Sequence, residues 1–167
     1  MKSTTLKTAN LIDDHPEAQS CETQFRCLGR RRAFQGRIRT VRCLEDNALV
    51  KRMLSEPGQS EVLVVDGRGS LRSALLGDVM ARLASKNGWA GVVIHGAVRD
   101  LSAIDEVDIG VKALGSNPRR SGKTGSGEVD GPVSFGTVKF IPGHWLYSDE
   151  DGILVSEKPL RSEAQSV

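Results

Sequence analysis

Two short segments of the sequence combine glycine with charged side chains in a way that could bind an acidic small molecule. Gly77 precedes Asp78, and the run Gly96-Ala97-Val98 precedes Arg99 and Asp100. An arginine guanidinium can bind an oxyanion through paired hydrogen bonds, while a neighbouring carboxylate can hold a hard divalent cation. The pattern therefore suggests a joint anion and metal site, and an ordinary surface ion pair between Arg99 and Asp100 is the alternative.

The hydrophobic pattern predicts the elements that would bring these segments together. Buried-type strands are expected over 62–65, 91–94 and 111–114, with helices beginning near Asp78 and covering 101–106. This βαβαβ order predicts an α/β fold with a parallel core sheet. Because loops leaving the carboxyl ends of parallel strands meet at one edge of the sheet, the two charged segments should lie close together, with Gly96 to Asp100 forming a turn.

Asp78 has two interpretations at the start of its predicted helix. The first backbone N–H groups of a helix, here those of Val79 and Met80, favour an anion such as a substrate carboxylate, and Gly77 allows close approach. The same position also suits an aspartate that merely caps the helix. The spacing leaves both interpretations open.

The remaining chain is predicted to surround this core. Residues 26–42 carry seven arginines and no acid, with apolar residues interleaved as in a strand with one wet face, and Asp46 resembles the N-cap of a helix over 48–54. The polar, glycine-rich segment 115–131 is expected to be a long surface loop or a cover flap. Antiparallel strands are expected afterwards, over 133–135, 138–141, 145–147 and 153–155.

Length and composition indicate one domain over residues 1–167, with 1–24 and 160–167 peripheral to it. The chain has 167 residues, 38% of them hydrophobic, and a formal net charge of +2. No apolar run approaches the roughly 18 residues of a membrane-spanning helix, and the first residues lack the apolar stretch of a secretory signal. We therefore expect a soluble, cytoplasmic protein without membrane contact, whose three cysteines are reduced thiols.

Several common sites are excluded by single positions. A dinucleotide-binding fingerprint starting at Gly67 fails because Arg72 stands where the third glycine is needed. A phosphate-binding P-loop ending at Lys123 fails because Asn117 replaces its leading glycine. There is no Gly-x-Ser-x-Gly nucleophile elbow, and the three histidines lie too far apart for a typical metal motif.

The spacing of the charged residues resembles that of a known enzyme family. Asp78 and Arg99 are separated by 20 residues. The resulting pattern, Asp-x20-Arg-Asp, is similar to that of the metal-dependent pyruvate aldolases that cleave 4-hydroxy-4-methyl-2-oxoglutarate, a family closely related to the regulator of ribonuclease activity A. The similarity extends through Phe34-x-Gly36-x-Ile38-x-Thr40-Val41, Glu45-Asp46-Asn47, Val64-Val65-Asp66-Gly67, Asn87-Gly88-Trp89-x-Gly91, Gly96 to Asp100, Asp108-Ile109-Gly110 and Asp149-Glu150-Asp151-Gly152-Ile153.

The resemblance implies a lyase with specific residue roles. Asp100 would ligate Mg²⁺ or Mn²⁺ with water completing the shell, and Arg99 would bind the oxo or enolate oxygen of a small 2-oxo acid. Backbone N–H groups of Gly77, Asp78, Val79 and Met80 would hold the substrate carboxylate, with Asp78 also positioning a metal-bound water. Cleavage beside a 2-oxo group leaves an enolate, whose charge a cation and a guanidinium stabilise. Oxaloacetate decarboxylation, which yields the same enolate, is expected as a side activity.

The resemblance also implies an architecture and an alternative function. The family fold is a compact swivelling-domain-like sandwich or barrel, assembled as a homotrimer with sites near subunit interfaces. The alternative is a non-enzymatic regulator that binds and inhibits a ribonuclease of the ribonuclease E type, for which the arginines of 26–42 are candidate contacts. Asp100 favours catalysis, because the regulator has lost the acid after its arginine, and few aromatic residues are available to stack on nucleic-acid bases.

One expected feature of the longer aldolases is missing. Those enzymes carry a C-terminal extension whose acidic residue reaches a neighbouring subunit's site, and this sequence shows no equivalent. Glu157 and Glu163 are not assigned to that role. Less efficient cleavage of the six-carbon substrate is therefore expected.

Overall fold

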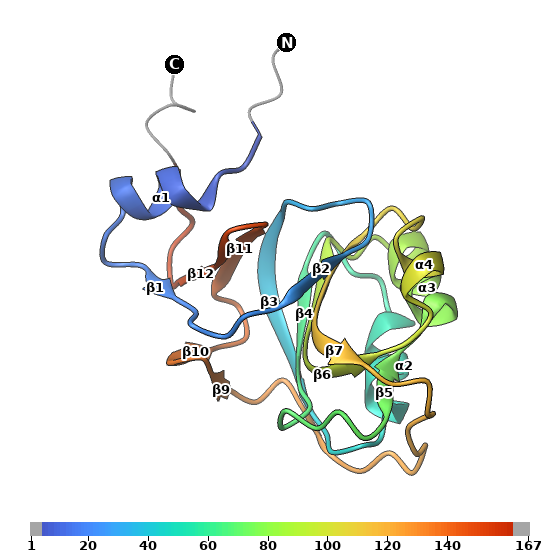
Figure 1. Cartoon of the computed structure of the whole chain (residues 1–167). Helices are drawn as coiled ribbons and strands as arrows, with labels where there is room; N and C mark the ends of the chain where they lie inside the picture. Colours follow the sequence, from blue (N-terminus) through green and yellow to red (C-terminus); the bar gives the residue numbers. More distant parts are fainter. Residues whose placement is uncertain (1–4, 162–167) are drawn as a thin grey trace.

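The computed structural model describes residues 5–161 and shows a mixed α/β fold built on a curled half-barrel sheet (Figure 1). The main path through the sheet runs β1-β12-β11-β3-β4-β6-β7-β2, with β5 paired to β6 and β8 paired to β3. A second, two-stranded sheet is formed by β9 and β10. The predicted α/β fold class is confirmed.

Four parallel strands form the centre of the sheet. They are β3 (Phe34–Arg42), β4 (Val62–Asp66), β6 (Gly91–Val98) and β7 (Gly110–Ser116). The connecting helices are α2 (Ala48–Leu54), α3 (Asp78–Lys86) and α4 (Leu101–Ile104). Val62, Leu63, Val64 and Val65 are all fully buried, as expected for a parallel strand covered on both faces.

The C-terminal part is antiparallel, as predicted. A hairpin of β11 (Trp145–Asp149) and β12 (Gly152–Ser156) pairs with β3 through β11. The short strands β9 (Val133–Phe135) and β10 (Val138–Phe140) form a separate hairpin. Of the predicted strand boundaries here, only Ile141 falls outside its strand.

The arginine-rich segment is not one strand, which corrects the prediction. It contains β2 (Arg26–Leu28), which pairs with β7, and then β3 on another part of the sheet. Gly29 separates them with a φ of +84°, a conformation that favours glycine, and its N–H donates to the Asp105 carboxylate at 3.0 Å. The chain therefore turns where the charge pattern alone looked continuous.

A second correction concerns the end of β6. Gly96, Ala97 and Val98 belong to the strand and not to a turn, and an unpredicted short strand, β5 (Ala74–Leu76), pairs with Ala97 and Val98. The pairing of β6 with β7 has an irregularity between Ile94 and Ala97. Arg99 and Asp100 consequently follow directly at the carboxyl end of β6.

Apolar side chains fill both faces of the sheet. One cluster, which includes Trp89 and Ile104, lies between the sheet and the helices, and another gathers around Phe34 and Phe140 on the opposite face. Helix α1 (Thr8–Asp14) lies at the edge of the molecule (Figure 1), where Leu11 packs against Leu154 and Leu160. β1 (Gln19–Ser20) pairs with β12. Of the segments predicted to be peripheral, 1–24 and 160–167, residues 1–4 and 162–167 lie outside the described part.

Within residues 5–161, no helix is long and apolar enough to cross a membrane.

Candidate active site

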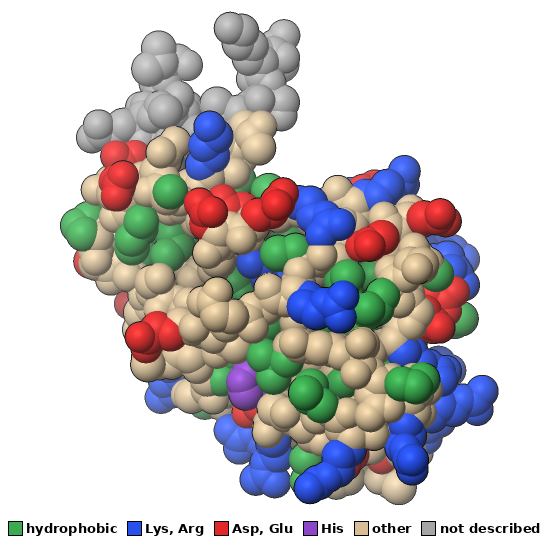
Figure 2. Space-filling view, in the orientation of Figure 1, with side chains coloured by type: hydrophobic (Ala, Val, Ile, Leu, Met, Phe, Trp, Pro, Cys, Tyr) green, Lys and Arg blue, Asp and Glu red, His purple; other side chains and the backbone are tan. Residues whose placement is uncertain are grey.

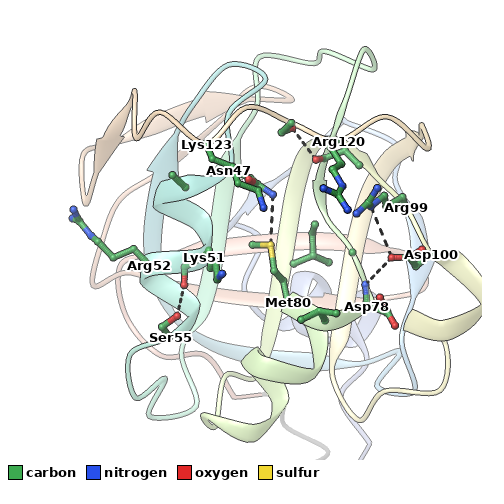
Figure 3. Close-up of a pocket in the computed structure, with 16 residues that line it drawn as sticks. Asn47, Lys51, Arg52, Ser55, Asp78, Met80, Arg99, Asp100, Arg120 and Lys123 are labelled. Carbon is green, nitrogen blue, oxygen red and sulfur yellow. Dashed lines mark hydrogen bonds and ion pairs between the residues drawn. The ribbon is translucent and has the colours of Figure 1, made fainter.

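A pocket of about 640 Å³ lies at the carboxyl end of the parallel strands, between α2, the start of α3 and the loop after β7 (Figure 3). All six residues expected at the site line this pocket: Gly77, Asp78, Val79, Met80, Arg99 and Asp100. Their meeting follows from the pairing of β5, which leads into α3, with the end of β6, which leads into Arg99 and Asp100. The chemical roles assigned to them stay predictions.

The two charged segments are joined by direct contacts. The Asp78 backbone N–H donates to Asp100 Oδ2 at 3.2 Å, and the Arg99 backbone N–H donates to the Leu76 carbonyl at 3.0 Å. A Cβ atom on Gly77 would lie 2.7 Å from Asp100 Oδ2. Any side chain at position 77 would therefore displace the Asp100 carboxylate, which passes close to the backbone there.

The backbone of Asp100 adopts a left-handed conformation, with φ of 60° and ψ of 45°. For a residue with a side chain this conformation costs on the order of 1 kcal/mol, and such strain concentrates at functional sites. The conformation sets Asp100 at the N-cap position of α4 and directs it to the start of α3 (Figure 3). Sequence patterns did not indicate this strain.

Asp78 is the first residue of α3, with Gly77 at the N-cap position, so the interpretation of Asp78 as a simple N-cap is wrong. Its carboxylate forms an ion pair of 2.8 Å with Arg82, one helical turn later. Burial alone would raise the pKa of Asp78, but hydrogen bonds from Arg82 and the Val79 backbone outweigh it, and the pKa lies below its ordinary value. Asp78 is therefore an anion at neutral pH.

Arg99 is held from two sides. Its Nη1 donates to the Pro118 carbonyl at 3.3 Å, and its Nε lies 3.9 Å from Asp100 Oδ2. The side chain is 35% exposed and lines the pocket. A guanidinium has five N–H donors, so Arg99 retains donors for an anionic ligand.

The pocket offers a divalent cation the carboxylate of Asp100 as a donor. Within residues 5–161 there is no group of three or more His, Cys, Asp or Glu residues that could hold a metal ion. Asp100, however, presents a hard oxygen donor with 41% side-chain exposure, and Mg²⁺ commonly keeps several waters while one or two carboxylates bind it. The site therefore fits a largely hydrated cation bound by Asp100.

The pocket also contains residues that the sequence interpretation missed. Asn47, Lys51 and Arg52 come from α2 and its N-cap, whereas Arg120 and Lys123 come from the loop after β7. The basic, glycine-rich composition of 115–131 was the available signal, but it did not indicate which surface the loop covers. The surface-loop prediction holds for most of this segment, although β8 (Glu128–Val129) lies within it.

The loop is tied down and does not form a free cover flap. The buried Asp46 carboxylate accepts hydrogen bonds from the backbone and hydroxyl of Thr124 at 2.6 and 2.7 Å, from Gly125 at 3.2 Å and from Ala48 at 3.2 Å. Burial would raise the pKa of Asp46, but these bonds hold it below its ordinary value. Asp46 was predicted to be the N-cap of α2, but the N-cap is Asn47, one residue later. The Asp46 carboxylate instead accepts hydrogen bonds from both the helix and the loop.

Residues 8–155 match the model of the RraA-like family, described as Aldolase/RraA. The chain belongs to the RraA-like family. This family includes both aldolases and ribonuclease inhibitors, which agrees with the resemblance drawn from the sequence.

Three solved structures have folds similar to that of this chain. An S-adenosylmethionine:2-dimethylmenaquinone methyltransferase from Geobacillus kaustophilus HTA426 is 45% identical with a TM-score of 0.91, covering 92% of this chain and 96% of its own. The RNA-processing inhibitor RraA from Thermus thermophilis is 47% identical with a TM-score of 0.90, covering 98% of both chains. Streptomyces coelicolor RraAS2, of the RNase ES inhibitor RraA family, is 28% identical with a TM-score of 0.73, covering 96% and 83%. The names of these structures describe different activities, a methyltransferase and inhibitors of RNA processing.

Proposed function

We propose that this RraA-like protein is a divalent-metal-dependent aldolase that cleaves 4-hydroxy-4-methyl-2-oxoglutarate into two pyruvates and also decarboxylates oxaloacetate. The observation that carries the proposal is the contact between Asp78 and Asp100. This contact brings the Asp100 carboxylate, the Arg99 guanidinium and the start of α3 together in one pocket, which supports binding of a cation beside an anionic substrate. A protein that only binds a ribonuclease has no need of this arrangement.

The pocket can orient a 2-oxo acid through complementary contacts. The substrate carboxylate would bind at the start of α3, where the Met80 N–H lacks an intrahelical acceptor and the Val79 N–H would exchange its bond to the Asp78 carboxylate for one to the substrate. The 2-oxo oxygen would accept a hydrogen bond from Arg99, which has donors to spare. Asp100 would hold Mg²⁺ or Mn²⁺, and the bound cation would supply Lewis-acid stabilisation of the developing enolate.

Cleavage then breaks the bond between C3 and C4 of the substrate. The electron pair of that bond passes to the pyruvyl fragment as an enolate, and Arg99 stabilises the negative charge on its oxygen. The C4 hydroxyl loses its proton to a water hydrogen-bonded to the Asp78 carboxylate, and C4 becomes the carbonyl of the second pyruvate. A proton added to C3 of the enolate completes the first pyruvate.

Oxaloacetate would follow the same course at the same residues. Breaking its C3–C4 bond releases CO₂ and leaves the same pyruvate enolate, which Arg99 stabilises in the same position. No proton has to be removed from a hydroxyl in this reaction. The decarboxylation therefore depends on Asp100 and Arg99 but less on Asp78.

The test is pyruvate release from each oxo acid with Mg²⁺ or Mn²⁺ present. We expect turnover of both compounds, loss of turnover in EDTA and recovery when the metal is restored. Activity that persists in EDTA and also in an Asp100→Asn variant would contradict the proposed chemistry.

The second candidate function is inhibition of a ribonuclease, supported by the name of the Thermus thermophilis relative. The arginines of 26–42 give it little support, because Arg31, Arg32 and Arg39 are paired with Asp108, Asp105 and Asp130. A salt-dependent pull-down of a ribonuclease E type enzyme would favour this function. Turnover without such binding would favour the aldolase.

We also propose the homotrimer implied by the family resemblance. Large apolar side chains are exposed, with Val79, which lines the pocket, 68% exposed and Leu71 49% exposed, as expected for surfaces that a neighbouring subunit covers. Light scattering should then give about three times the 18.0 kDa mass of one chain. A mass near that of a single chain would contradict the trimer.

A further inference from the structure

The pocket holds more positive charge than the cleavage of a simple 2-oxo acid requires. Five basic and two acidic residues line it, and the acidic Asp78 is already paired with Arg82. Arg99 is the basic residue assigned to the oxo oxygen. The others are Lys51, Arg52, Arg120 and Lys123.

Lys and Arg side chains gather at the lower end of the molecule in Figure 2. Among the basic residues that line the pocket, Lys51, Arg52, Arg120 and Lys123 have no acidic partner within the described part of the chain. Arg31, Arg39 and Arg82 each contact an aspartate at 2.8–2.9 Å. Within residues 5–161, by contrast, the side chains of Lys51, Arg120 and Lys123 have no hydrogen bond or ion pair to any other side chain. Like charges gathered in one pocket repel each other, and a bound anion would relieve that repulsion.

The backbone that carries Lys123 is rigidly attached to the helix that carries Lys51. Besides the four bonds accepted by Asp46, the Asn47 N–H donates to the Gly122 carbonyl at 3.0 Å, and the Gly122 N–H donates to the Glu45 carbonyl at 2.9 Å. Lys123 accordingly lies beside Asn47 at the start of α2 (Figure 3). The two lysines therefore line one pocket from two segments that are joined by hydrogen bonds.

Arg120 is attached at a different point. The Ala74 N–H of β5 donates to the Arg119 carbonyl at 2.8 Å, and the Ser121 hydroxyl donates to the Ala74 carbonyl at 2.7 Å. These bonds enclose Arg120 between two anchored neighbours on the same side of the pocket as Arg99 (Figure 3). Arg52 differs, because its side chain points away from Arg99 and Asp100 in the same view.

From this arrangement we infer that Lys51, Arg120 and Lys123 form a second anion subsite, which takes the carboxylate on the carbonyl fragment of the substrate. The inference rests on the proposed function, since it assumes that Arg99 and α3 bind the pyruvyl fragment. It makes the three cations determinants of specificity for oxo acids with two carboxylates. Substrates whose C4 carries only hydrogen or alkyl groups would leave the three charges unpaired.

The carboxylate of the carbonyl fragment is the group that such a subsite can recognise. In 4-hydroxy-4-methyl-2-oxoglutarate this carboxylate is attached to C4, on the far side of the bond that breaks. Before cleavage it belongs to the substrate, and after cleavage it belongs to the second pyruvate. Basic side chains that hold it would bind substrate and product alike, so their loss should raise KM far more than it lowers kcat.

A binding experiment tests the subsite without requiring turnover. 2-Oxoglutarate keeps the distal carboxylate but has no C4 hydroxyl for aldol cleavage, and 2-oxopentanoate replaces that carboxylate with a methyl group. With Mg²⁺ present, calorimetry should show 2-oxoglutarate binding at least about tenfold more tightly, as expected for charge-assisted hydrogen bonds. Equal affinities for the two compounds would overturn the inference.

Variants test whether the three cations cause the preference for 2-oxoglutarate. Combined Lys51→Met, Arg120→Met and Lys123→Met changes should reduce the preference for 2-oxoglutarate to less than about threefold, while 2-oxopentanoate binding stays unchanged. The matched control combines Arg26→Met, Lys86→Met and Lys158→Met. It also replaces one arginine and two lysines, but none of them lines the pocket. A control that loses the preference equally would show a general effect of net charge and overturn the subsite.

The same experiment separates the subsite from the proposed function. If no oxo acid is cleaved but the preference and its loss are observed, the subsite stands and the aldolase function fails. If cleavage is observed but the pocket variant keeps its preference, the aldolase function stands and the subsite fails. Thermal unfolding of each variant verifies that it is folded, which is expected because the three exposed side chains contribute nothing to the core.

Discussion

The backbone N–H of Asp78 donates a 3.2 Å hydrogen bond to the carboxylate of Asp100, 22 residues later in the chain. This bond connects the start of α3 with the end of β6, so the candidate anion-binding backbone and the candidate metal ligand move as one unit. It also occupies one lone pair of Asp100 Oδ2 and orients the rest of the carboxylate. Variants of the residues around this bond provide separate tests of binding, chemistry and stability.

Replacing Asp100 with asparagine should abolish most of the activity while preserving the fold. Asparagine retains an oxygen that can accept the Asp78 N–H, but it lacks the charge that a divalent cation requires. We expect kcat/KM to fall about 100-fold or more, with a weaker apparent affinity for Mg²⁺. Pyruvate release measured against metal concentration tests this expectation, and a variant with unchanged metal dependence would remove Asp100 as the metal ligand.

Replacing Arg99 with alanine should affect catalysis much more than stability. The guanidinium makes one hydrogen bond, at 3.3 Å to the Pro118 carbonyl, and is partly exposed, so unfolding should change little. Loss of a donor aimed at a developing oxyanion typically lowers kcat by about 100- to 1,000-fold. Steady-state kinetics and urea unfolding should be measured together, because a large drop in stability would make the kinetic result uninformative about the role of Arg99 and contradict this expectation.

A Gly77→Ala substitution tests the close approach between the two segments. The added Cβ would lie 2.7 Å from Asp100 Oδ2, so the carboxylate must shift. We expect activity and metal affinity to fall about tenfold or more, because displaced ligands lose their geometry. Gly115→Ala is the matched control, since its Cβ would make only an ordinary contact of 3.5 Å with Leu71. Equal activity in the two variants would show that this approach does not matter.

Asp46 should contribute to stability in a manner that depends on pH. Its pKa is lowered in the folded protein, because hydrogen bonds outweigh the effect of burial, so the folded state binds a proton less readily than the unfolded chain. The stabilisation is therefore fully present above the unfolded pKa of about 4 and is lost as the pH falls through the lower folded value. An Asp46→Asn variant should be less stable than the parent by about 1–3 kcal/mol at pH 7.

The measurement is urea unfolding of the parent and Asp46→Asn proteins at several pH values. The difference between them should be constant from about pH 5 upward and should shrink below about pH 4. The parent contacts also anchor Lys123, so the variant should bind 2-oxoglutarate more weakly at pH 7. A difference that grows as the pH falls would contradict the lowered pKa.

The sequence determined the core of the fold and six of the residues that line the candidate pocket. The apolar runs Val62–Val65, Gly91–Ile94 and Val111–Leu114, separated by helical patterns, are sufficient to specify parallel strands. Parallel strands end at one edge, so Gly77–Met80 and Arg99–Asp100 had to converge. These conclusions depend on local periodicity and on a general rule of topology, both of which a single sequence contains.

The tertiary structure decided the features that depend on contacts between distant segments. The left-handed backbone of Asp100, the insertion of β5 beside β6 and the bonds from Asp46 to Thr124 arise from packing between residues that lie far apart in the chain. No periodic pattern records such contacts, because hydrogen bonds between loops depend on position and not on residue type alone. For the same reason the sequence did not indicate that Lys51, Arg120 and Lys123 line the pocket. Their position depends on the hydrogen bonds between the start of α2 and the loop after β7.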